Sequence, residues 1–206
     1  MASEHRRLNP RKQPRQVRAE LTRERILTAA AHVFAEHGYA AGTTNRIAER
    51  ARVSIGSLYQ YYPNKDAILL ELLTRHLDDG MASARLRRAE ELPDSLEEIV
   101  RLWVRTVIEH HFEDPQLLRV LADQAPRSRE LLEKESRLEQ ELVGYFQDLL
   151  EDHPEVKVTD THIASRIVFS TLELVVHKLI AAPEPIDHSR LEAELVAMIT
   201  RYLTAA

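Results

Sequence analysis

The spacing of apolar residues is the feature that most restricts how this chain can fold. Apolar side chains recur every three or four positions from Thr22 to Tyr202, and runs that alternate apolar and polar residues are absent. The first spacing is typical of one face of an α-helix, whereas alternation is typical of a half-buried strand. Only 5 of the 206 residues are glycine, and prolines separate segments of helix length. The sequence therefore predicts an all-α chain of about nine helices.

The charge is divided between a basic front and an acidic remainder. Residues 1–70 contain 12 Lys and Arg against 6 Asp and Glu, whereas residues 71–206 contain 16 against 27. A basic front favours an anionic partner, and the acidic remainder argues against general binding to polyanions. On charge alone, a chance distribution explains these numbers equally well.

Three segments are expected. Residues 1–18 hold six basic residues, one acid and two prolines, with almost nothing apolar to bury, which predicts a disordered basic arm. Residues 19–66 are expected to form a head of three helices, and residues 67–206 a larger helical body. Contact of the arm with DNA and a floppy tail are equally compatible with its composition.

Capping residues place the helices of the head. The first helix is expected to start near Thr22 and to stop at Gly38 in a left-handed conformation. Thr43 or Thr44 would cap the second helix and Ser54 the third, which would run from Ile55 to about Tyr61. Asn64 would cap a long fourth helix.

The two short helices, joined by a tight turn, fit a helix-turn-helix, although many helical proteins contain such a pair by accident. The exposed positions of the second of these helices are uncharged, namely Ile55, Gly56, Ser57, Tyr59, Gln60 and Tyr61. Small, amide and apolar side chains can read the base edges and thymine methyls of a major groove. Gly56 would let the backbone approach a base closely, the alternative being a glycine that only helps packing.

Residues that flank this helix are placed for phosphates. Thr43 and Thr44 stand at a helix start, where hydroxyl and free N–H groups can meet an anion. Lys65 stands in the first turn of the fourth helix, where a cation is unfavourable for the helix dipole, so a phosphate is a reasonable partner. A solvated lysine is the alternative. Positive charge on the same side is added by Arg46, Arg50 and Arg52, although two of these three could be ordinary surface charges.

The stretch from Arg25 to Leu69 contains a set of residues at characteristic spacing: Ile26 to Ala30, Phe34, Gly38, Tyr39, Thr43, Thr44, Ile47, Ala48, Val53, Ser54, Gly56, Leu58, Tyr59, Tyr61, Tyr62 and Lys65. With this set, the stretch resembles the DNA-binding head of the TetR family of transcriptional regulators. The departures from the family pattern are Tyr62, where phenylalanine is usual, and Pro63 before the fourth helix. A buried Tyr62 would need a partner for its hydroxyl.

The resemblance implies a homodimer that binds a near-palindromic operator in double-stranded DNA, most often a repressor released by a small molecule bound in the body. It implies base contacts from Ile55, Gly56 and Ser57, and phosphate contacts from Thr44, Tyr59, Gln60, Tyr61 and Lys65, to which the local chemistry adds Thr43 and Arg46. It also puts the dimer contact on the last two helices. Their apolar bands, which include Leu172, Val176, Ile180, Leu195 and Ile199, are compatible with a four-helix seam or with the core of the monomer.

The pocket of the body is less determined. Trp103, Val107, Phe112, Tyr145, Phe146 and Phe169 are candidates to line a cavity for a largely apolar effector, although each is individually more typical of a plain core residue. Nearby polar candidates are Thr106, His110, His162, Glu173 and His177. Glu173 and His177 are four residues apart and could pair. No metal site is expected at His110 and His111, because adjacent residues on a helix do not converge.

Several classes of protein are excluded or unsupported. The absence of cysteine excludes a disulfide framework, a thiolate zinc site and a cysteine nucleophile. No catalytic motif or phosphate loop is present, so neither an all-α enzyme nor a cofactor is expected. The longest stretch without Asp, Glu, Lys or Arg is the twelve residues from Val53 to Asn64, too short to cross a bilayer. Without an apolar leader, the expected location is cytoplasmic. A DNA-packaging protein without sequence preference is the remaining alternative. The acidic body argues against it.

Overall fold

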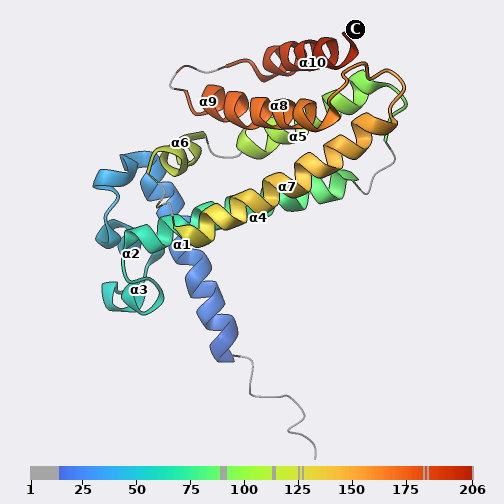
Figure 1. The fold of residues 1–206 in the computed structure, drawn as a ribbon. Coiled ribbons are helices and arrows are strands. Elements are labelled where there is room, and N and C mark those ends of the chain that lie inside the picture. Colours follow the sequence, from blue (N-terminus) through green and yellow to red (C-terminus); the bar gives the residue numbers. More distant parts are fainter. Residues whose placement is uncertain are drawn as a thin grey trace, which may run out of the picture. The chain divides into compact units, whose positions relative to one another are not determined.

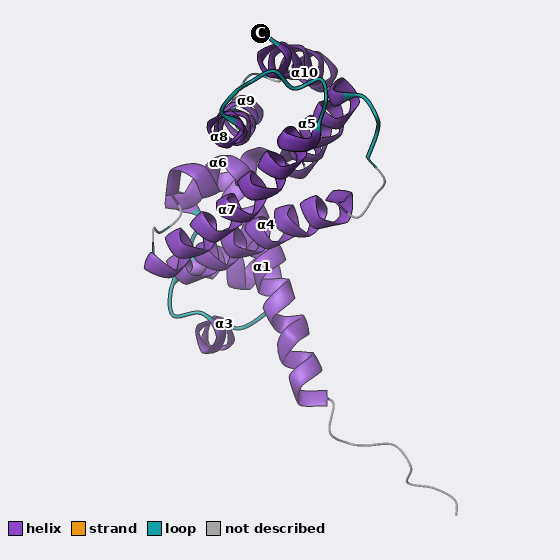
Figure 2. Ribbon diagram, turned by 45° about the vertical axis from the view of Figure 1, so that its right-hand side comes forward, coloured by secondary structure: helices purple, strands orange, loops and turns teal. Residues whose placement is uncertain are grey.

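The computed structural model describes residues 14–88, 92–112, 115–124, 126, 128–182, 184 and 186–205, without the side chains of residues 14, 15 and 122. All regular structure within these residues is helical (Figures 1 and 2). Because α8, η1 and α9 follow one another without a break, the described elements form nine helical rods, which confirms the predicted fold class. Residues 1–13 of the expected arm lie outside the described residues.

The chain divides after Ile68 into two compact units, here called the head unit and the body unit. The elements in chain order are α1 (Pro14–Ala41), α2 (Thr44–Ala51), α3 (Ile55–Tyr61), α4 (Lys65–Arg88), α5 (Leu96–Phe112), α6 (Pro115–Gln124), α7 (Arg129–Asp152), α8 (Thr161–Thr171), the π-helical turn η1 (Leu172–Val176), α9 (His177–Ile180) and α10 (His188–Thr204). None of the helices in the described part of the chain is both long and apolar enough to span a membrane.

Helix α1 begins at Pro14, well before the start expected near Thr22, so residues 14–18 of the expected arm are helical. Proline suits the first turn of a helix, and the Arg, Gln, Ala, Glu and Leu residues that follow are good helix formers. The apolar pattern did not reveal this start because Val17 and Leu21 are exposed and bury no stripe.

At Gly38 the backbone has φ 70° and ψ 172°, and the helix kinks and continues to Ala41. The expected positive φ is present, but the ψ angle is extended rather than left-handed helical. This region of conformational space is almost restricted to glycine. The expected helix stop is therefore a kink.

The predicted caps of the head unit are confirmed. Thr43 accepts a hydrogen bond from the backbone N–H of Arg46 at 3.3 Å, Ser54 accepts one from Ser57 at 3.0 Å, and Asn64 accepts one from Ala67 at 2.9 Å. The helices bury one apolar face each, and fully buried members are Ile26, Phe34, Ile47, Leu58 and Ile68. Tyr62 is buried, and its hydroxyl accepts a hydrogen bond from Arg23 Nε at 3.2 Å, which supplies the partner that the sequence required.

In the body unit, α10 packs against α5 and α7 packs against α8. All five residues expected at a dimer contact belong to this unit's own core, with exposed fractions of 5% or less. Leu172, Val176, Ile180, Leu195 and Ile199 are therefore core residues, and the expectation that they face a second copy is wrong for this arrangement. The sequence of a wide apolar band does not indicate which side of the helix a neighbouring helix covers. Here α5 packs against η1 and α10.

Other apolar residues of the α8–η1–α9 rod and of α10 are exposed in the body unit. Ile163, Ile167 and Leu174 are exposed on α8 and η1, and Met198 and Tyr202 on α10. Residues 163 and 167, like 198 and 202, are four apart and so share a helix face. An apolar surface of this kind remains available to a partner.

We expect Gly38→Ala to lower the free energy of unfolding by about 1–3 kcal/mol, because an L side chain is strained at this φ and ψ. A Cβ would meet nothing within 4 Å, so the cost is conformational and not steric. Gly144→Ala in α7 is the matched control: its Cβ also meets nothing within 4 Å, and alanine should stabilise that helix by up to about 1 kcal/mol. Urea denaturation of the full chain measures both, and an unchanged Gly38→Ala would contradict the kink.

Candidate functional site

Helix α3 presents an uncharged face on the surface of the head unit. Ile55 is 39% exposed and Tyr59 51%, Gly56 and Gln60 are exposed, and Ser57 and Tyr61 are half-buried. The opposite side is anchored by Leu58, which is fully buried. The positions expected to read bases are therefore on the outside of the unit.

Gly56 has free space around it. A Cβ at this position would meet nothing closer than Ser54 Oγ at 4.0 Å. Packing within the described residues therefore does not require a glycine at this position, contrary to the alternative that Gly56 only helps packing. Since glycine weakens a helix by about 1 kcal/mol relative to alanine, something outside the head unit is the more economical explanation.

The hydroxyl groups of α2 and α3 are linked. Thr44 Oγ1 and the Tyr59 hydroxyl lie 3.2 Å apart, within hydrogen-bonding distance. Thr43 is exposed and caps α2 through its own side chain. These contacts fix the positions of three side chains expected to hold phosphates, and they hold α2 and α3 in one arrangement.

The arginines of α2 differ in their partners. Arg50 Nη1 donates to both carboxylate oxygens of Glu36 at 2.8 Å, so its charge is largely offset. Arg46 is exposed and its Nη1 lies 3.0 Å from His37 Nε2, a contact with an imidazole rather than a carboxylate. Arg46 therefore keeps more of its positive charge for an anion than Arg50 does.

Lys65 is engaged within the head unit. Its Nζ donates to the carbonyl of Tyr39 at 2.7 Å and lies 3.5 Å from that of Ala40, and it sits 4.0 Å from the centre of the Tyr39 ring. These carbonyls, at the end of α1, explain a cation in the first turn of α4 without an external phosphate. The sequence alone does not reveal this contact, because the partner lies on another helix. Contact with a phosphate remains a prediction.

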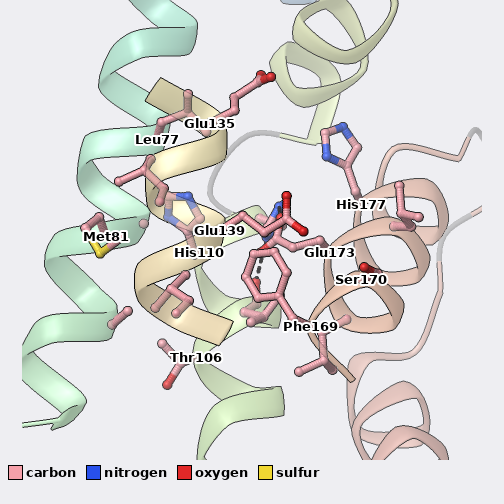
Figure 3. Close-up of a pocket in the computed structure, with 18 of the residues that line it drawn as sticks. Leu77, Met81, Thr106, His110, Glu135, Glu139, Phe169, Ser170, Glu173 and His177 are labelled. Carbon is pink, nitrogen blue, oxygen red and sulfur yellow. Dashed lines mark hydrogen bonds and ion pairs between the residues drawn. The ribbon is translucent and has the colours of Figure 1, made fainter. Parts of the chain in front are cut away.

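The body unit contains a cavity of about 450 Å³ between α4, α5, α7 and the α8–η1–α9 rod (Figure 3). Four of the six candidates line it: Trp103, Val107, Phe146 and Phe169. Phe112 instead is 47% exposed with its ring 3.7 Å from that of His188. Tyr145 packs beside Trp103, with the guanidinium of Arg88 4.3 Å from its ring. The helical spacing of apolar residues in the sequence does not distinguish residues that line the cavity from residues that pack in the adjoining core.

Histidines gather at one side of this cavity. His76 on α4 stacks on His110 of α5 with ring centres 4.2 Å apart, and His111 lies 5.5 Å from His177. Gly80 leaves room for this cluster, since a Cβ there would come within 2.8 Å of His110 Nε2. The sequence indicated His110 and His177 but gave no sign of His76, whose neighbours come from another helix. Within the described residues, no group of three or more metal-binding side chains is arranged to hold an ion.

Burial keeps most of this cluster neutral. It lowers the pKa of His76 to about 3, with further lowering by His110, His111 and His177. Burial also lowers the pKa of His111 and that of His177. Because a buried imidazole loses hydration when it is charged, these three side chains are uncharged at neutral pH.

Glu173 on η1 projects toward the same space (Figure 3). Burial raises the pKa of its carboxyl to about 7. A pair with His177 was one possibility for this side chain; in the structure Glu173 Oε2 lies 3.7 Å from His111 Nε2. His177 lines the same cavity, with its ring centre 5.5 Å from that of His111, so both residues of the i, i+4 pair lie beside His111. His162, a further polar candidate, lies outside the cavity, with Nδ1 2.9 Å from Gln147 Oε1.

The raised pKa of Glu173 predicts how stability depends on pH. The folded chain retains a proton that the unfolded chain loses near pH 4.5, so this group makes stability fall as pH rises from about 4.5 through about 7. Glu173→Gln lacks the titrating carboxyl. We therefore expect its unfolding free energy to exceed that of the wild type by about 1–2 kcal/mol at pH 8, allowing for screening in the cavity, and the difference to shrink at pH 5.

Urea denaturation at the two pH values measures this difference. Glu133→Gln is the control, because Glu133 forms an exposed pair with Arg129 at 2.8 Å and such pairs contribute little. A Glu173→Gln variant less stable than wild type at both pH values would show that the carboxylate is favourably solvated or paired.

Two family models match the chain. Residues 26–72 match the model of bacterial regulatory proteins, tetR family. Residues 95–203 match the model described as tetracyclin repressor-like, C-terminal domain. The matches fall on the head unit with the first turns of α4, and on most of the body unit.

Curated relatives are similar over shorter stretches. An HTH-type transcriptional repressor of Streptomyces coelicolor is 33% identical over 102 residues, which are 50% of this chain and 48% of that protein. The HTH-type transcriptional regulator HbdR of Aromatoleum is 44% identical over 59 residues, 29% of this chain and 26% of that protein. The chain thus spans half or less of the length of these relatives.

A solved structure shares the fold. A TetR-like transcriptional regulator from Rhodococcus superposes with a TM-score of 0.70, covering 95% of this chain and 100% of that one at 20% identity. At this identity the likeness concerns the fold alone.

Proposed function

The chain belongs to the TetR family of bacterial regulatory proteins, and we propose that it is a sequence-specific DNA-binding repressor whose operator is released when a small molecule binds in the body unit. One observation carries the DNA-binding part: α3 exposes an uncharged face whose glycine has no packing role within the head unit. Such a face is suited to a major groove, where charge is required at the phosphates and not at most base edges.

Each side chain has a role in this proposal. Ile55, Gly56 and Ser57 lie along base edges, with Gly56 allowing close approach. The phosphates on either side are held by Thr43, Thr44, Arg46, Tyr59, Gln60, Tyr61 and Lys65. The Thr44–Tyr59 contact favours this because it orders both hydroxyls before DNA arrives, which reduces the entropy lost on binding.

The cavity supports the ligand-responsive part. Its lining combines apolar and aromatic side chains with polar ones that could orient a ligand, as small-molecule sites commonly do. Helix α4 starts in the head unit at Lys65 and lines the cavity with Leu73, Leu77 and Met81. A ligand that prefers another position of α4 would thereby change the head and weaken operator binding, with a coupling of about 1–3 kcal/mol that acts equally in both directions.

We propose a regulator in preference to an all-α enzyme or a sequence-neutral DNA-packaging protein. Selection of bound duplexes from a random pool distinguishes them. A regulator of this kind enriches a palindrome with half-sites spaced by whole turns. A packaging protein retains duplexes but enriches no sequence. An enzyme without a DNA-binding function retains no duplexes.

Gly56→Glu should weaken binding to the selected duplex about 10- to 100-fold, because a carboxylate would meet base edges at a place where the head unit itself has room. Gly144→Glu is the matched control, since it adds the same charge in α7 where a Cβ meets nothing within 4 Å. Fluorescence anisotropy at 0.15 M salt measures both affinities. If Gly56→Glu folds and binds like the wild type, α3 does not lie in the groove.

For the homodimer, we propose that the exposed apolar side of α8 and α10 is the contact, in place of the five core residues. Ile167→Glu on this side should convert a two-chain particle to a single chain, because a carboxylate would be buried without a partner. Leu132→Glu, which changes a residue 44% exposed on α7, should leave the mass unchanged. Light scattering after size-exclusion chromatography gives the mass, and a dimer that persists in Ile167→Glu places the contact elsewhere.

A further inference from the structure

Resting on the proposed effector cavity, we propose that its ligand is an apolar molecule that carries a positive charge, held by the carboxylate of Glu173 beside an aromatic wall.

The first observation is the sign of the lining charges. Among the described residues that line the cavity, the acidic side chains are Glu135, Glu139 and Glu173, and no lysine or arginine is present. Glu139 has Arg166 Nη2 at 3.9 Å, but both side chains are more than 40% exposed, so this pair is weak. The cavity therefore repels anions and attracts cations.

The histidine cluster does not reverse this sign. His76, His111 and His177 are uncharged at neutral pH because burial lowers the pKa of each. Neutral imidazoles offer lone pairs as well as N–H groups. They accommodate a cation without repelling it.

Aromatic and apolar side chains complete the site. Trp103 and Phe146 lie with ring centres 5.2 Å apart, and Phe169 projects into the cavity from α8 (Figure 3). The faces of such rings attract cations, most strongly when water is excluded. In addition, Trp103 Nε1 is buried and has no hydrogen-bond partner among the described residues, which favours a ligand that also offers it an acceptor atom.

The contact between Glu173 and His111 shows what a cation would replace. His111 Nδ1 lies 2.8 Å from the carbonyl of Val107, and because a carbonyl only accepts, this nitrogen donates. In the neutral ring Nε2 then carries a lone pair, which faces Glu173 Oε2 at 3.7 Å. A carboxylate opposite a lone pair is unfavourable without a positive charge, so this contact favours the protonated form of Glu173 in the empty cavity, and a bound cation favours the ionised form.

The test compares three probes of equal length over a series of phenylalkyl chains: a trimethylammonium compound, its neutral isostere with a tert-butyl group, and a carboxylate. Calorimetry with the full chain at pH 8 should show the cation binding at least about 10-fold tighter than the isostere, and the carboxylate binding weakest. Trimethylammonium has a fixed charge, so any pH dependence arises from the protein.

Lowering the pH from 8 to 6 should weaken binding of the cation about 10-fold, because Glu173 must lose its proton to bind it. Calorimetry at pH 7 in buffers of different ionisation enthalpy should show release of about half a proton per site. The other titratable groups that face this space are His76 on α4, His110 and His111 on α5, Glu135 and Glu139 on α7, and His177 on α9.

Glu173→Gln separates Glu173 from these groups. It should remove the preference for the cation and the proton release, while binding of the neutral isostere stays within about twofold, which shows an intact cavity. Glu133→Gln should change none of these quantities. If Glu173→Gln still prefers the cation over the isostere, with the same pH dependence, the proposed role of Glu173 is overturned.

Other outcomes distinguish this proposal from the proposed function. Equal binding of cation and isostere, with either one releasing the operator, overturns the ligand charge and leaves the regulator proposal in place. Tighter binding of the carboxylate does the same. Failure of every probe in the series to bind overturns the charge proposal and the effector cavity together, while operator selection tests DNA binding independently.

Discussion

Every described element of this chain is a helix. An amphipathic helix is stable only when its apolar stripe is buried against neighbouring helices. This constraint decides which residues remain for function. In the head unit, Leu58 anchors α3 and leaves its other side to the solvent. In the body unit, the stripes of α5, α8, η1 and α10 meet one another, and they leave open a cavity and a set of exposed apolar side chains.

Local signals in the sequence predicted the head unit well. Thr43, Ser54 and Asn64 cap the helices that they were expected to cap, because capping depends on residues within one turn. Contacts between helices were not predictable in the same way. The engagement of Lys65 with the carbonyl of Tyr39 and the position of His76 beside His110 depend on which faces meet, and a single sequence does not contain that information.

The body unit shows the limit most clearly. The apolar period identified Trp103 and Phe146 as residues of the cavity wall but placed Tyr145, which packs beside Trp103, in the same wall. It also identified the bands of α8 and α10 correctly as apolar, yet Leu172 and Leu195 point into the unit while Ile167 and Met198 point out. In a band this wide, the orientation is set by neighbouring helices. The π-helical turn η1, which carries Glu173, had no signature in the apolar pattern.

The open space around Gly56 has a consequence for how such a protein diversifies. Side chains on the outer face of α3 make few demands on the core beneath them. Under the proposed function, substitutions there would change DNA preference with little penalty in folding, so selection would retarget the molecule to new operators one base at a time, while the body unit would change independently to recognise a different effector.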